Sequence, residues 1–381
     1  MTQAVFVLGA GASYEYGLPT GADLIEEITT LCGELDKISR TGSQREDSFR
    51  GVLIRALNMK TSDQQFKDLR NDDLNKLAGL SRSLWLAKSI DNYINDQEDA
   101  TIAYLGKFAI TACILRAERT GRKFLKEGES RHTLASLFPK TRDKPHRLDF
   151  GSIRDTWLID FFRELRGQVQ RSKLGQRLAS VSIINFNYDR CIEQFLFNAF
   201  KEYDNLSDRD AAELVNSINI IHPYGTVGRL PWQNASDDTG QPVKIDYGYI
   251  DGGEAITIAA EGIQTFTQSQ DSKIIEHVQS LVNNSSCIAF LGFGFHKQNM
   301  KLLGIDTVRV PQNSEARNVY ATTHGMSDRR TELVLQDLGV FSIGTAPSPL
   351  NSAKGPRVNT SSGTCTDFFF EFGEDVFNNL V

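Results

Sequence analysis

Short apolar runs that end in glycine or polar residues recur along this chain, and they predict a buried parallel β-sheet. They lie at 5–8, 181–184, 218–222, 286–291, 318–322 and 340–343. Segments with helical spacing of apolar residues follow several of them, as at 191–199, 274–282 and 328–338. The alternation of strands and helices favours an α/β fold built on a parallel sheet.

The stretch between residues 41 and 178 has a different pattern and is predicted to be mostly helical. Leucines recur near helical spacing from Leu74 to Leu86, and apolar residues do so again from Trp157 to Leu165. Residues 104–115 are apolar throughout, which is typical of a buried central helix. Because the stretch carries no recognisable catalytic motif, we interpret it as a helical insertion that packs over the sheet or builds an oligomer interface. A second catalytic domain is the alternative.

The first strand runs directly into a turn of small residues, Gly9-Ala10-Gly11-Ala12-Ser13, and Gly17-Leu18-Pro19 follows. Small side chains let backbone N–H groups approach a ligand, and a strand, a glycine turn and a helix together bind phosphate in nucleotide folds. Thr20 with Asp23 predicts the start of the next helix. Tyr14 stands where a dinucleotide-binding Gly-x-Gly-x-x-Gly motif needs glycine, which disfavours hydride transfer. A turn that only joins strand to helix is the alternative.

Polar side chains stand at the carboxyl ends of two further strands, where parallel sheets bind ligands. Asn187 and Asp189 follow the second predicted strand, and His222 ends the third, before Gly225. Asn187 can donate and accept hydrogen bonds, whereas Asp189 can accept them from ribose hydroxyls. The alternatives are a turn residue, a helix N-cap and a structural histidine, respectively. A second glycine turn, Gly292-Phe293-Gly294-Phe295, is expected to face the first across the sheet.

Composition and charge disfavour several classes of function. The 381 residues carry a net charge of −6 with lysine and arginine spread along the chain, so no basic stripe indicates direct binding of nucleic acid. The five cysteines are scattered without a Cys-x-x-Cys pair, which argues against a zinc ribbon or a disulfide framework. No apolar run approaches the ~18 residues of a membrane span. We therefore expect a reduced, cytoplasmic protein that needs no metal.

In chain order, these four strand ends resemble those of the sirtuin family over about residues 1–30 and 180–345. The resemblance implies a Rossmann-like parallel sheet of sirtuin type, formed by residues 1–40 and 179–345 and interrupted by the helical insertion 41–178. It also implies NAD as the substrate, with its phosphates on the first glycine turn and its adenosine half at the second. Asn187 and Asp189 would hold the ribose and nicotinamide side. The implied NAD-binding residues are Gly9, Ala10, Gly11, Ala12, Ser13, Pro19, Tyr224, Gly292, Phe293 and Gly294.

Departures from the sirtuin pattern indicate one branch of the family. Sirtuin deacylases carry a four-cysteine zinc module, which this chain lacks, and they have Asp-Phe-Arg where it has Thr20-Gly21-Ala22. They place glutamine before the asparagine, where this chain has Phe186. The remaining pattern resembles the zinc-less sirtuin-like effectors of bacterial antiphage defence, which hydrolyse NAD to ADP-ribose and nicotinamide. Size and the Asn-Tyr-Asp element are most similar to the subunit that assembles with a HerA-type hexameric ATPase, which implies a homo-oligomer and that partner.

The expected general base is His222. The family often reads His-x-His-Gly, and here Tyr224 stands next to Gly225. An unperturbed tyrosine, with a pKa near 10, is a poor base at neutral pH, so His222 is favoured and the role of Tyr224 stays open. Asn187 would hold the attacking water or the ribose, and Asp189 would orient the ribose or support the developing positive charge.

Other functions are compatible with the same residues. A sensor of NAD or ADP-ribose would keep the glycine turns without a base, and an NAD-dependent deacylase would add a groove for acyl-lysine. A nuclease is disfavoured because no carboxylate cluster suits two metal ions. The C-terminal segment, 346–381, is predicted to be a polar tail whose apolar end, Phe368–Phe372, docks on the chain itself or on a partner subunit.

Overall fold

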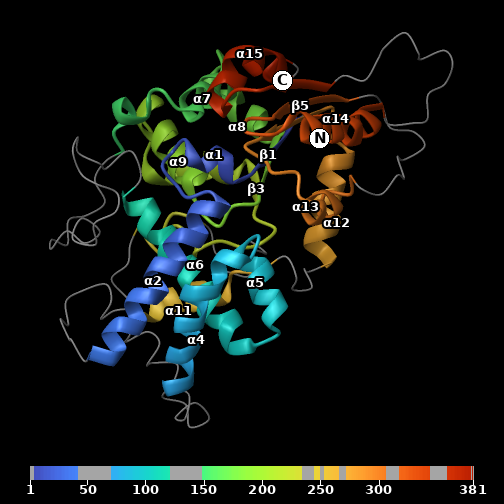
Figure 1. Cartoon of the computed structure of the whole chain (residues 1–381). Helices are drawn as coiled ribbons and strands as arrows, with labels where there is room; N and C mark the ends of the chain where they lie inside the picture. Colours follow the sequence, from blue (N-terminus) through green and yellow to red (C-terminus); the bar gives the residue numbers. More distant parts are fainter. Residues whose placement is uncertain are drawn as a thin grey trace.

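The computed structural model describes residues 4–41, 70–120, 148–233, 244–248, 253–265, 272–305, 317–343, 358–378 and 380. Its centre is a six-stranded sheet in the order β3-β2-β1-β4-β5-β6, and every neighbouring pair is parallel (Figure 1). The strands are β1 Ala4–Leu8, β2 Val181–Asn185, β3 Asn219–Ile221, β4 Cys287–Leu291, β5 Asn318–Thr322 and β6 Val358–Ser361. The predicted α/β fold with a Rossmann-like parallel sheet is confirmed.

The central strand β1 divides its side chains between two hydrophobic cores. Val5 and Val7 pack into one core, whereas Phe6 and Leu8 pack into the other. All of β1 is buried, as a strand covered on both faces requires. The register pairs Leu8 with the last residue of β2 and with the last residue of β4. The carboxyl ends of three strands that are far apart in the sequence therefore lie side by side.

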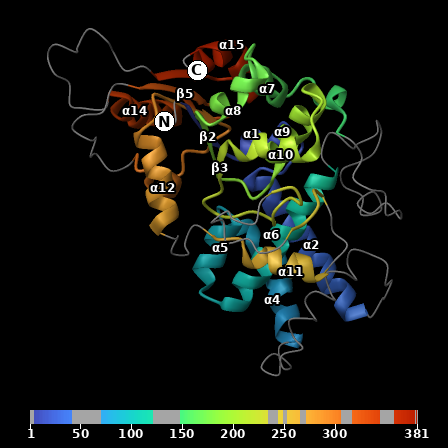
Figure 2. The same cartoon turned by 180° about the vertical axis from the view of Figure 1, so that it is seen from behind.

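One face of the sheet is covered by helices from the middle and the end of the chain (Figure 2). They are α7 Trp157–Arg166, preceded by the 3₁₀ turn η4 Phe150–Ile153, α8 Arg171–Leu178, α9 Cys191–Tyr203, α10 Asp208–Asn216 and α15 Cys365–Phe377. In the C-terminal helix α15, Phe369 stacks on Trp157 with ring centroids 5.7 Å apart. The N–H of Cys365, which begins α15, donates to Glu15 Oε1 at 2.6 Å. The apolar end of the tail thus packs on the chain itself.

The other face carries two groups of helices. Against the half of the sheet that contains β4 and β5 lie α12 Ser272–Asn283, α13 Lys297–Leu302 and α14 Asp328–Ile343. The second group extends below the sheet in Figure 1, and we call it the helical lobe. It comprises α2 Gly21–Thr41, α4 Arg70–Ser83, the 3₁₀ turn η2 Leu84–Leu86, α5 Ile90–Gln97, α6 Ala100–Thr120 and α11 Gly253–Glu261.

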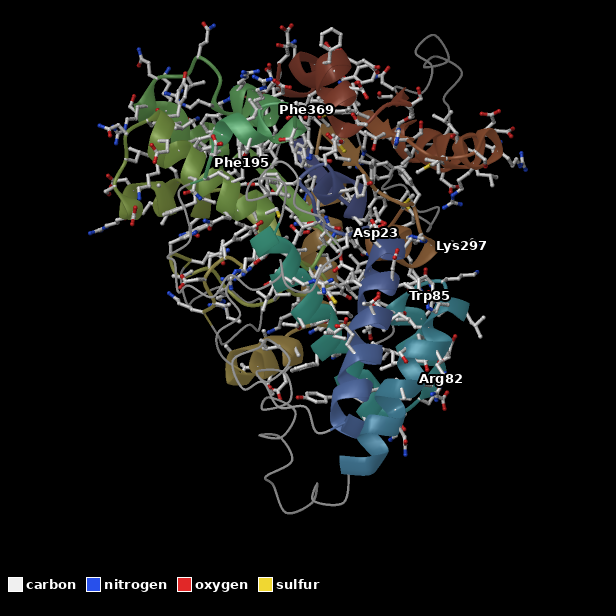
Figure 3. All side chains as sticks on the ribbon, turned by 60° about the vertical axis from the view of Figure 1, so that its left-hand side comes forward. Asp23, Arg82, Trp85, Phe195, Lys297 and Phe369 are labelled. Carbon is white, nitrogen blue, oxygen red and sulfur yellow. The ribbon has the colours of Figure 1, made fainter. Side chains whose placement is uncertain are left out.

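Helix α2 begins where the sequence predicts and leads from the sheet into the helical lobe. The N–H of Thr20 donates to Asp23 Oδ2 at 2.9 Å, and the N–H of Asp23 donates to Thr20 Oγ1 at 3.3 Å. This reciprocal pair satisfies two of the N–H groups that a helix start leaves free. In Figure 3, Asp23 lies at the end of α2 nearest the sheet, whereas Arg82 lies further down beside the helix.

The membership of the helical lobe differs from the predicted insertion 41–178. α2 precedes that segment and α11 follows it, yet both pack against α6. Conversely, α7 and α8 belong to the segment but pack on the sheet. The domain boundaries stay a prediction, and parts of the segments 41–178 and 346–381 lie outside the described residues.

Helix α6 is the long apolar helix at the centre of the lobe. Among the described residues, it is the one helix that is long and apolar enough to cross a membrane by length and composition, contrary to our expectation that no run approaches this. However, 61% of its most apolar window is buried inside the protein, against α2, α4, α5 and α11. A core helix has the same composition, which agrees with the prediction of a buried helix at 104–115.

Two predictions near the edge of the sheet were wrong. Residues 340–343 form the last turn of α14 instead of a strand, because they continue the helix that begins at Asp328. The sixth strand, at 358–361, was not predicted. Its sequence, Val-Asn-Thr-Ser, lacks the apolar run of the inner strands because it pairs on one side only, with β5.

Candidate functional site

Two glycine turns meet at the carboxyl ends of β1 and β4. The N–H of Gly9 donates to the Leu291 oxygen and the N–H of Gly11 donates to the Gly292 oxygen, both at 3.0 Å. A Cβ on Gly9 would lie 2.6 Å from the Gly292 oxygen. Gly292 itself has a φ of +55°, and a Cβ there would lie 2.0 Å from the nitrogen of Ala12. The second turn faces the first, as predicted, and glycine is required because the two backbones touch.

The predicted phosphate cradle is a single helical turn, α1 Ala10–Tyr14. The N–H groups of Gly9, Gly11 and Ala12 all donate to backbone oxygens. The turn therefore offers fewer free donors to a pyrophosphate than the sequence suggested. Of the other predicted NAD-binding residues here, Pro19 is half-buried beyond the turn.

Asn187 bridges the segment after β2 to the first glycine turn. Its Nδ2 donates to the Gly9 oxygen and to Ser13 Oγ, both at 2.9 Å. Because a carbonyl oxygen only accepts hydrogen bonds, the contact with Gly9 fixes which end of the carboxamide is nitrogen. Both hydrogens of Nδ2 are thus used, and no described residue donates to Oδ1. This half-buried side chain presents a free hydrogen-bond acceptor.

Ser13 links Asn187 to Asp189. The Ser13 hydroxyl donates to the Asp189 carboxylate, which also accepts from the N–H of Cys191 at 3.0 Å. Burial raises the pKa of Asp189, and these hydrogen bonds oppose that rise. The bond to Cys191 satisfies one N–H at the start of α9, but the N-cap residue is Arg190 and not Asp189 as our alternative interpretation had it. Asp189 is only 2% exposed and lies behind Ser13. An effect of Asp189 on a bound ligand would therefore pass through Ser13 or through the charge of the carboxylate.

His222, beyond β3, contacts the backbone of Asn187. Its Nδ1 is 2.9 Å from the Asn187 oxygen, and its Nε2 is 2.6 Å from Oε1 of Glu193 in α9. The His222 and Glu193 side chains are only 4% and 3% exposed. Burial lowers the pKa of His222, but the charge and hydrogen bond of Glu193 outweigh it and raise the pKa above the ordinary value. Because both nitrogens face acceptors, neither is directed at a substrate, and the role of general base stays a prediction.

An aromatic cluster holds two of the other predicted NAD-binding residues. Phe186, Tyr224 and Phe293 are buried, and the Phe186 ring centroid lies 5.6 Å from that of Tyr224 and 5.2 Å from that of Phe293. The Tyr224 hydroxyl donates to Asn299 Oδ1 at 2.7 Å, and burial raises the pKa of Tyr224 well above its ordinary value. Tyr224 therefore stays protonated at neutral pH and is even less available as a base than a free tyrosine. Gly294 is exposed.

The segment after β2 also reaches into the helical lobe. The Tyr188 hydroxyl donates to Asp91 Oδ1 of α5 at 2.9 Å. Arg190 forms an ion pair with Glu118 of α6 at 2.5 Å, in which the side chains are 1% and 0% exposed. Glu118 accepts in addition from the N–H of Gly248 at 3.1 Å. Burial raises the pKa of Asp91 to about 6, against the opposing hydrogen bond from Tyr188.

Three acidic residues of this arrangement escaped the sequence analysis: Asp91, Glu118 and Glu193. Each lies in a helix that the pattern assigned to packing alone. The available signal was an acidic side chain next to apolar neighbours, as in Cys191-Ile192-Glu193, because a buried carboxylate needs a partner. The partners themselves lie too far away in the sequence for such a signal to identify them.

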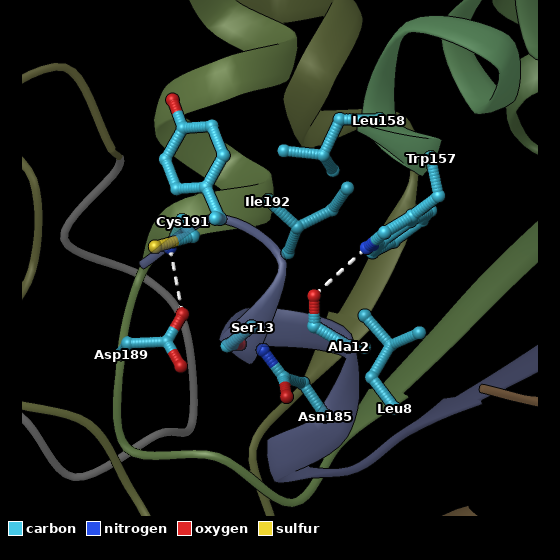
Figure 4. A pocket seen from close by; sticks show the side chains of 10 residues that line it. Leu8, Ala12, Ser13, Trp157, Leu158, Asn185, Asp189, Cys191 and Ile192 are labelled. Atoms are coloured by element: carbon cyan, nitrogen blue, oxygen red, sulfur yellow. Dashed lines mark hydrogen bonds between the residues drawn. The ribbon is translucent and has the colours of Figure 1, made fainter. Parts of the chain in front are cut away.

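A small pocket with a volume of about 10 Å³ lies beside Ser13 (Figure 4). Ser13, Asn185 and Asp189 line it together with apolar side chains of α7 and α9. At its wall, Trp157 Nε1 donates to the Ala12 oxygen at 2.8 Å. A cavity needs roughly 10–15 Å³ to hold one water molecule, so this pocket has room for about one water and not for NAD.

Within the described ranges, no group of three or more His, Cys, Asp or Glu side chains could hold a metal ion. All five cysteines are free and buried. The polar groups gathered at the strand ends are the free acceptor of Asn187, the Ser13 hydroxyl and the Asp189 carboxylate, and the His222 ring contacts the backbone oxygen of Asn187.

Comparison with known proteins finds a family match for part of the chain. Residues 181–343 match the family described as a SIR2-like domain, which covers less than half of the chain. A search of curated proteins finds no match. The matched segment runs from β2 to the end of α14, and it includes Asn187, Asp189, His222 and the second glycine turn but not the first. The match supports a sirtuin-like protein and indicates an NAD-related activity in broad terms.

Proposed function

We propose that this protein is an NAD hydrolase that cleaves NAD to ADP-ribose and nicotinamide. The proposal is carried by the carboxamide of Asn187, whose two donor bonds are used within the protein and whose oxygen is free to accept. The SIR2-like match over residues 181–343 supports NAD as the substrate. From the resemblance to antiphage effectors alone, we also propose that NAD depletion serves bacterial defence, in a homo-oligomer that associates with a HerA-type ATPase in the cytoplasm.

The chemistry of NAD hydrolysis fits a site of this kind. Nicotinamide is cationic in NAD and leaves as a neutral molecule, so the unstable species is an oxocarbenium-like ribose. Oδ1 of Asn187 would accept a hydrogen bond from the attacking water or from a ribose hydroxyl and so hold it in place. The Asp189 carboxylate, when ionised behind Ser13, would favour positive charge on the ribose. Water adds to C1′ as the C–N bond breaks, and the proton it loses passes to solvent.

Nicotinamide release from NAD tests this proposal. Removing a positioning group at a reacting centre typically costs about 10²-fold in rate, so Asn187→Ala should lower kcat by about that factor. The matched control is Asn198→Ala, because Asn198 lies on α9 and its hydrogen bond goes to the Gln194 oxygen and not to a residue of the site. We expect the control to release nicotinamide at the wild-type rate.

Two results would contradict the hydrolase and point to the alternatives. If the wild type binds NAD but releases no nicotinamide, alone or with a co-encoded ATPase, the protein is a sensor. If release requires an acetylated peptide, it is a deacylase. Equal loss of activity in the Asn187→Ala and Asn198→Ala variants would move the site away from Asn187.

A further inference from the structure

Asn187 is held from two sides that differ in their chemistry. On one side, its carboxamide binds the Gly9 oxygen and Ser13 through neutral hydrogen bonds. On the other side, its backbone oxygen accepts from His222, which is bound to Glu193. The first set of contacts leaves Oδ1 free, and the second set fixes the peptide from which the side chain projects.

We infer that His222 and Glu193 form a buried ion pair that positions Asn187, so that His222 acts through Asn187 and not on the substrate. This inference rests on the proposed function, since it assigns Asn187 the contact with water or ribose. It differs from the sequence-based prediction that His222 is the general base, because in the positioning role His222 keeps its protons.

The protonation of His222 follows from its surroundings. A backbone oxygen can only accept, so Nδ1 must carry a hydrogen, and a carboxylate oxygen at 2.6 Å from Nε2 calls for a second one. Glu193 of α9 and Asp189 of the segment after β2 are the titratable groups that act on the ring, and both favour its charged form. A protonated imidazole has no lone pair with which to accept a proton.

Glu193 supports the same interpretation. Its Oε2 is buried and has no hydrogen-bond partner among the described residues. A buried carboxylate with one oxygen unpaired is unfavourable for folding, and a buried ion pair is weak evidence for stability in itself. A positioning role gives a reason for the carboxylate, because its bond to Nε2 orients the ring so that Nδ1 is turned toward the Asn187 oxygen.

The fold brings the His222–Glu193 pair next to Asn187. β2 and β3 are neighbours in the sheet, so the residues that follow them lie close together. The N–H of Gly225 donates to the His222 oxygen at 3.0 Å and closes a turn that fixes the histidine backbone. A displacement of about 1 Å at a reacting group can cost about 10²-fold in rate, so loss of this support should be visible in kcat.

Two variants separate positioning from base catalysis. His222→Ala removes both the ring and the contact with Asn187. The double variant His222→Asn with Glu193→Gln removes the titratable ring and balances the charge, but the asparagine amide lies near the position of Nδ1 and can donate to the Asn187 oxygen. We expect His222→Ala to lose about 10²-fold in kcat and the double variant to recover to within about tenfold of the wild type.

The pH profile gives a second readout. If His222 positions Asn187, Glu193→Gln leaves the acid limb of kcat in place, because a neutral ring can still donate through Nδ1. If His222 is the base, that limb moves to lower pH with Glu193→Gln, and the double variant is as inactive as His222→Ala. Either of these last two results overturns the inference.

Crystal structures of the wild type and of His222→Ala keep this test independent of the proposed function. Should the wild type prove inert toward NAD, the hydrolase fails, but the inference still requires that Asn187 Nδ2 leave the Gly9 oxygen in His222→Ala. An unmoved Asn187 in that structure overturns the inference whatever the activity, and a displaced one supports it.

Discussion

The four residues from Asn187 to Arg190, which follow β2 and Phe186, face two regions of the molecule that hold them in different ways. Asn187 and Asp189 face the glycine turns, where neutral hydrogen bonds and direct backbone contacts prevail. Tyr188 and Arg190 face the helical lobe, where each meets a carboxylate. The side chains therefore alternate between the two regions along a segment that bends at Asn187 and Tyr188.

We propose that the region of the glycine turns contacts the ligand, whereas the helical lobe holds the segment in place. On the turn side, Oδ1 of Asn187 is left without a donor among the described residues. On the lobe side, both oxygens of Glu118 are bonded, to the Arg190 side chain and to backbone N–H groups. Changes on the lobe side should therefore act mainly on stability, and changes on the turn side on activity.

The largest effect on stability is expected from breaking the Arg190–Glu118 pair. Removing one partner of a buried ion pair leaves the other charge unpaired and typically costs about 3–5 kcal/mol, so Glu118→Ala should lower the free energy of unfolding by that amount. Chemical denaturation measures it. The matched control is Glu213→Ala, which removes one partner of the exposed pair with Arg209 and should leave the denaturation curve unchanged.

If Glu118→Ala and Glu213→Ala prove equally stable, the lobe does not hold the segment through charge, and the contrast between the two regions fails. Folded Glu118→Ala protein should also release nicotinamide more slowly, because Arg190 and Asn187 belong to one short segment. The loss should be smaller than that of Asn187→Ala.

The sequence was most informative where local chemistry decides the structure. Asn187 and Asp189 could be identified because polar residues at the end of an apolar run mark the carboxyl edge of a parallel sheet. The pairs Tyr188–Asp91 and Arg190–Glu118 could not, since they join residues of the lobe to a segment more than 70 positions later. Strand β6 was not predicted, because an edge strand needs no apolar run. Residues 340–343 were predicted to be a strand, but their apolar side chains continue a helix.

An intermediate effect is expected from a side chain between the glycine turns. Gly292→Ala combines a positive φ with a Cβ placed 2.0 Å from the nitrogen of Ala12, and such strain and overpacking together cost roughly 2–4 kcal/mol. Gly325→Ala is the control, because Gly325 also has a positive φ, +72°, but nothing lies within 4 Å of its Cβ position. Thermal unfolding of the two variants therefore separates backbone strain from the contact between the turns.

Two outcomes are informative for the turn side. A Gly292→Ala variant that is as stable as Gly325→Ala would mean that the turns can separate without cost. Loss of nicotinamide release in Gly292→Ala, with release intact in Gly325→Ala, would tie activity to the close contact of the turns.

The smallest effect is expected from the other acidic contact on the lobe side and depends on pH. Burial raises the pKa of Asp91 in the folded protein to about 6 from an ordinary value near 4. The folded state thus binds this proton more tightly than the unfolded state, so the contribution of Asp91 to stability is greatest below pH 4 and falls as pH rises to about 6. Asp91→Asn removes this dependence, while the amide oxygen can still accept from Tyr188.

Asp91→Asn should consequently gain on the order of 1–2 kcal/mol relative to the wild type between pH 4 and pH 8, measured by denaturation at both values. The control is Asp96→Asn, an exposed residue of the same helix, which should follow the wild type at both pH values. A variant of Asp91 that loses stability at pH 8 would show that its charge supports the lobe side as Glu118 does. The helical lobe would then hold the segment by two charged contacts. In the arrangement that we expect, it holds the segment by one ion pair, and the protein is more stable when the Asp91 carboxyl is neutral.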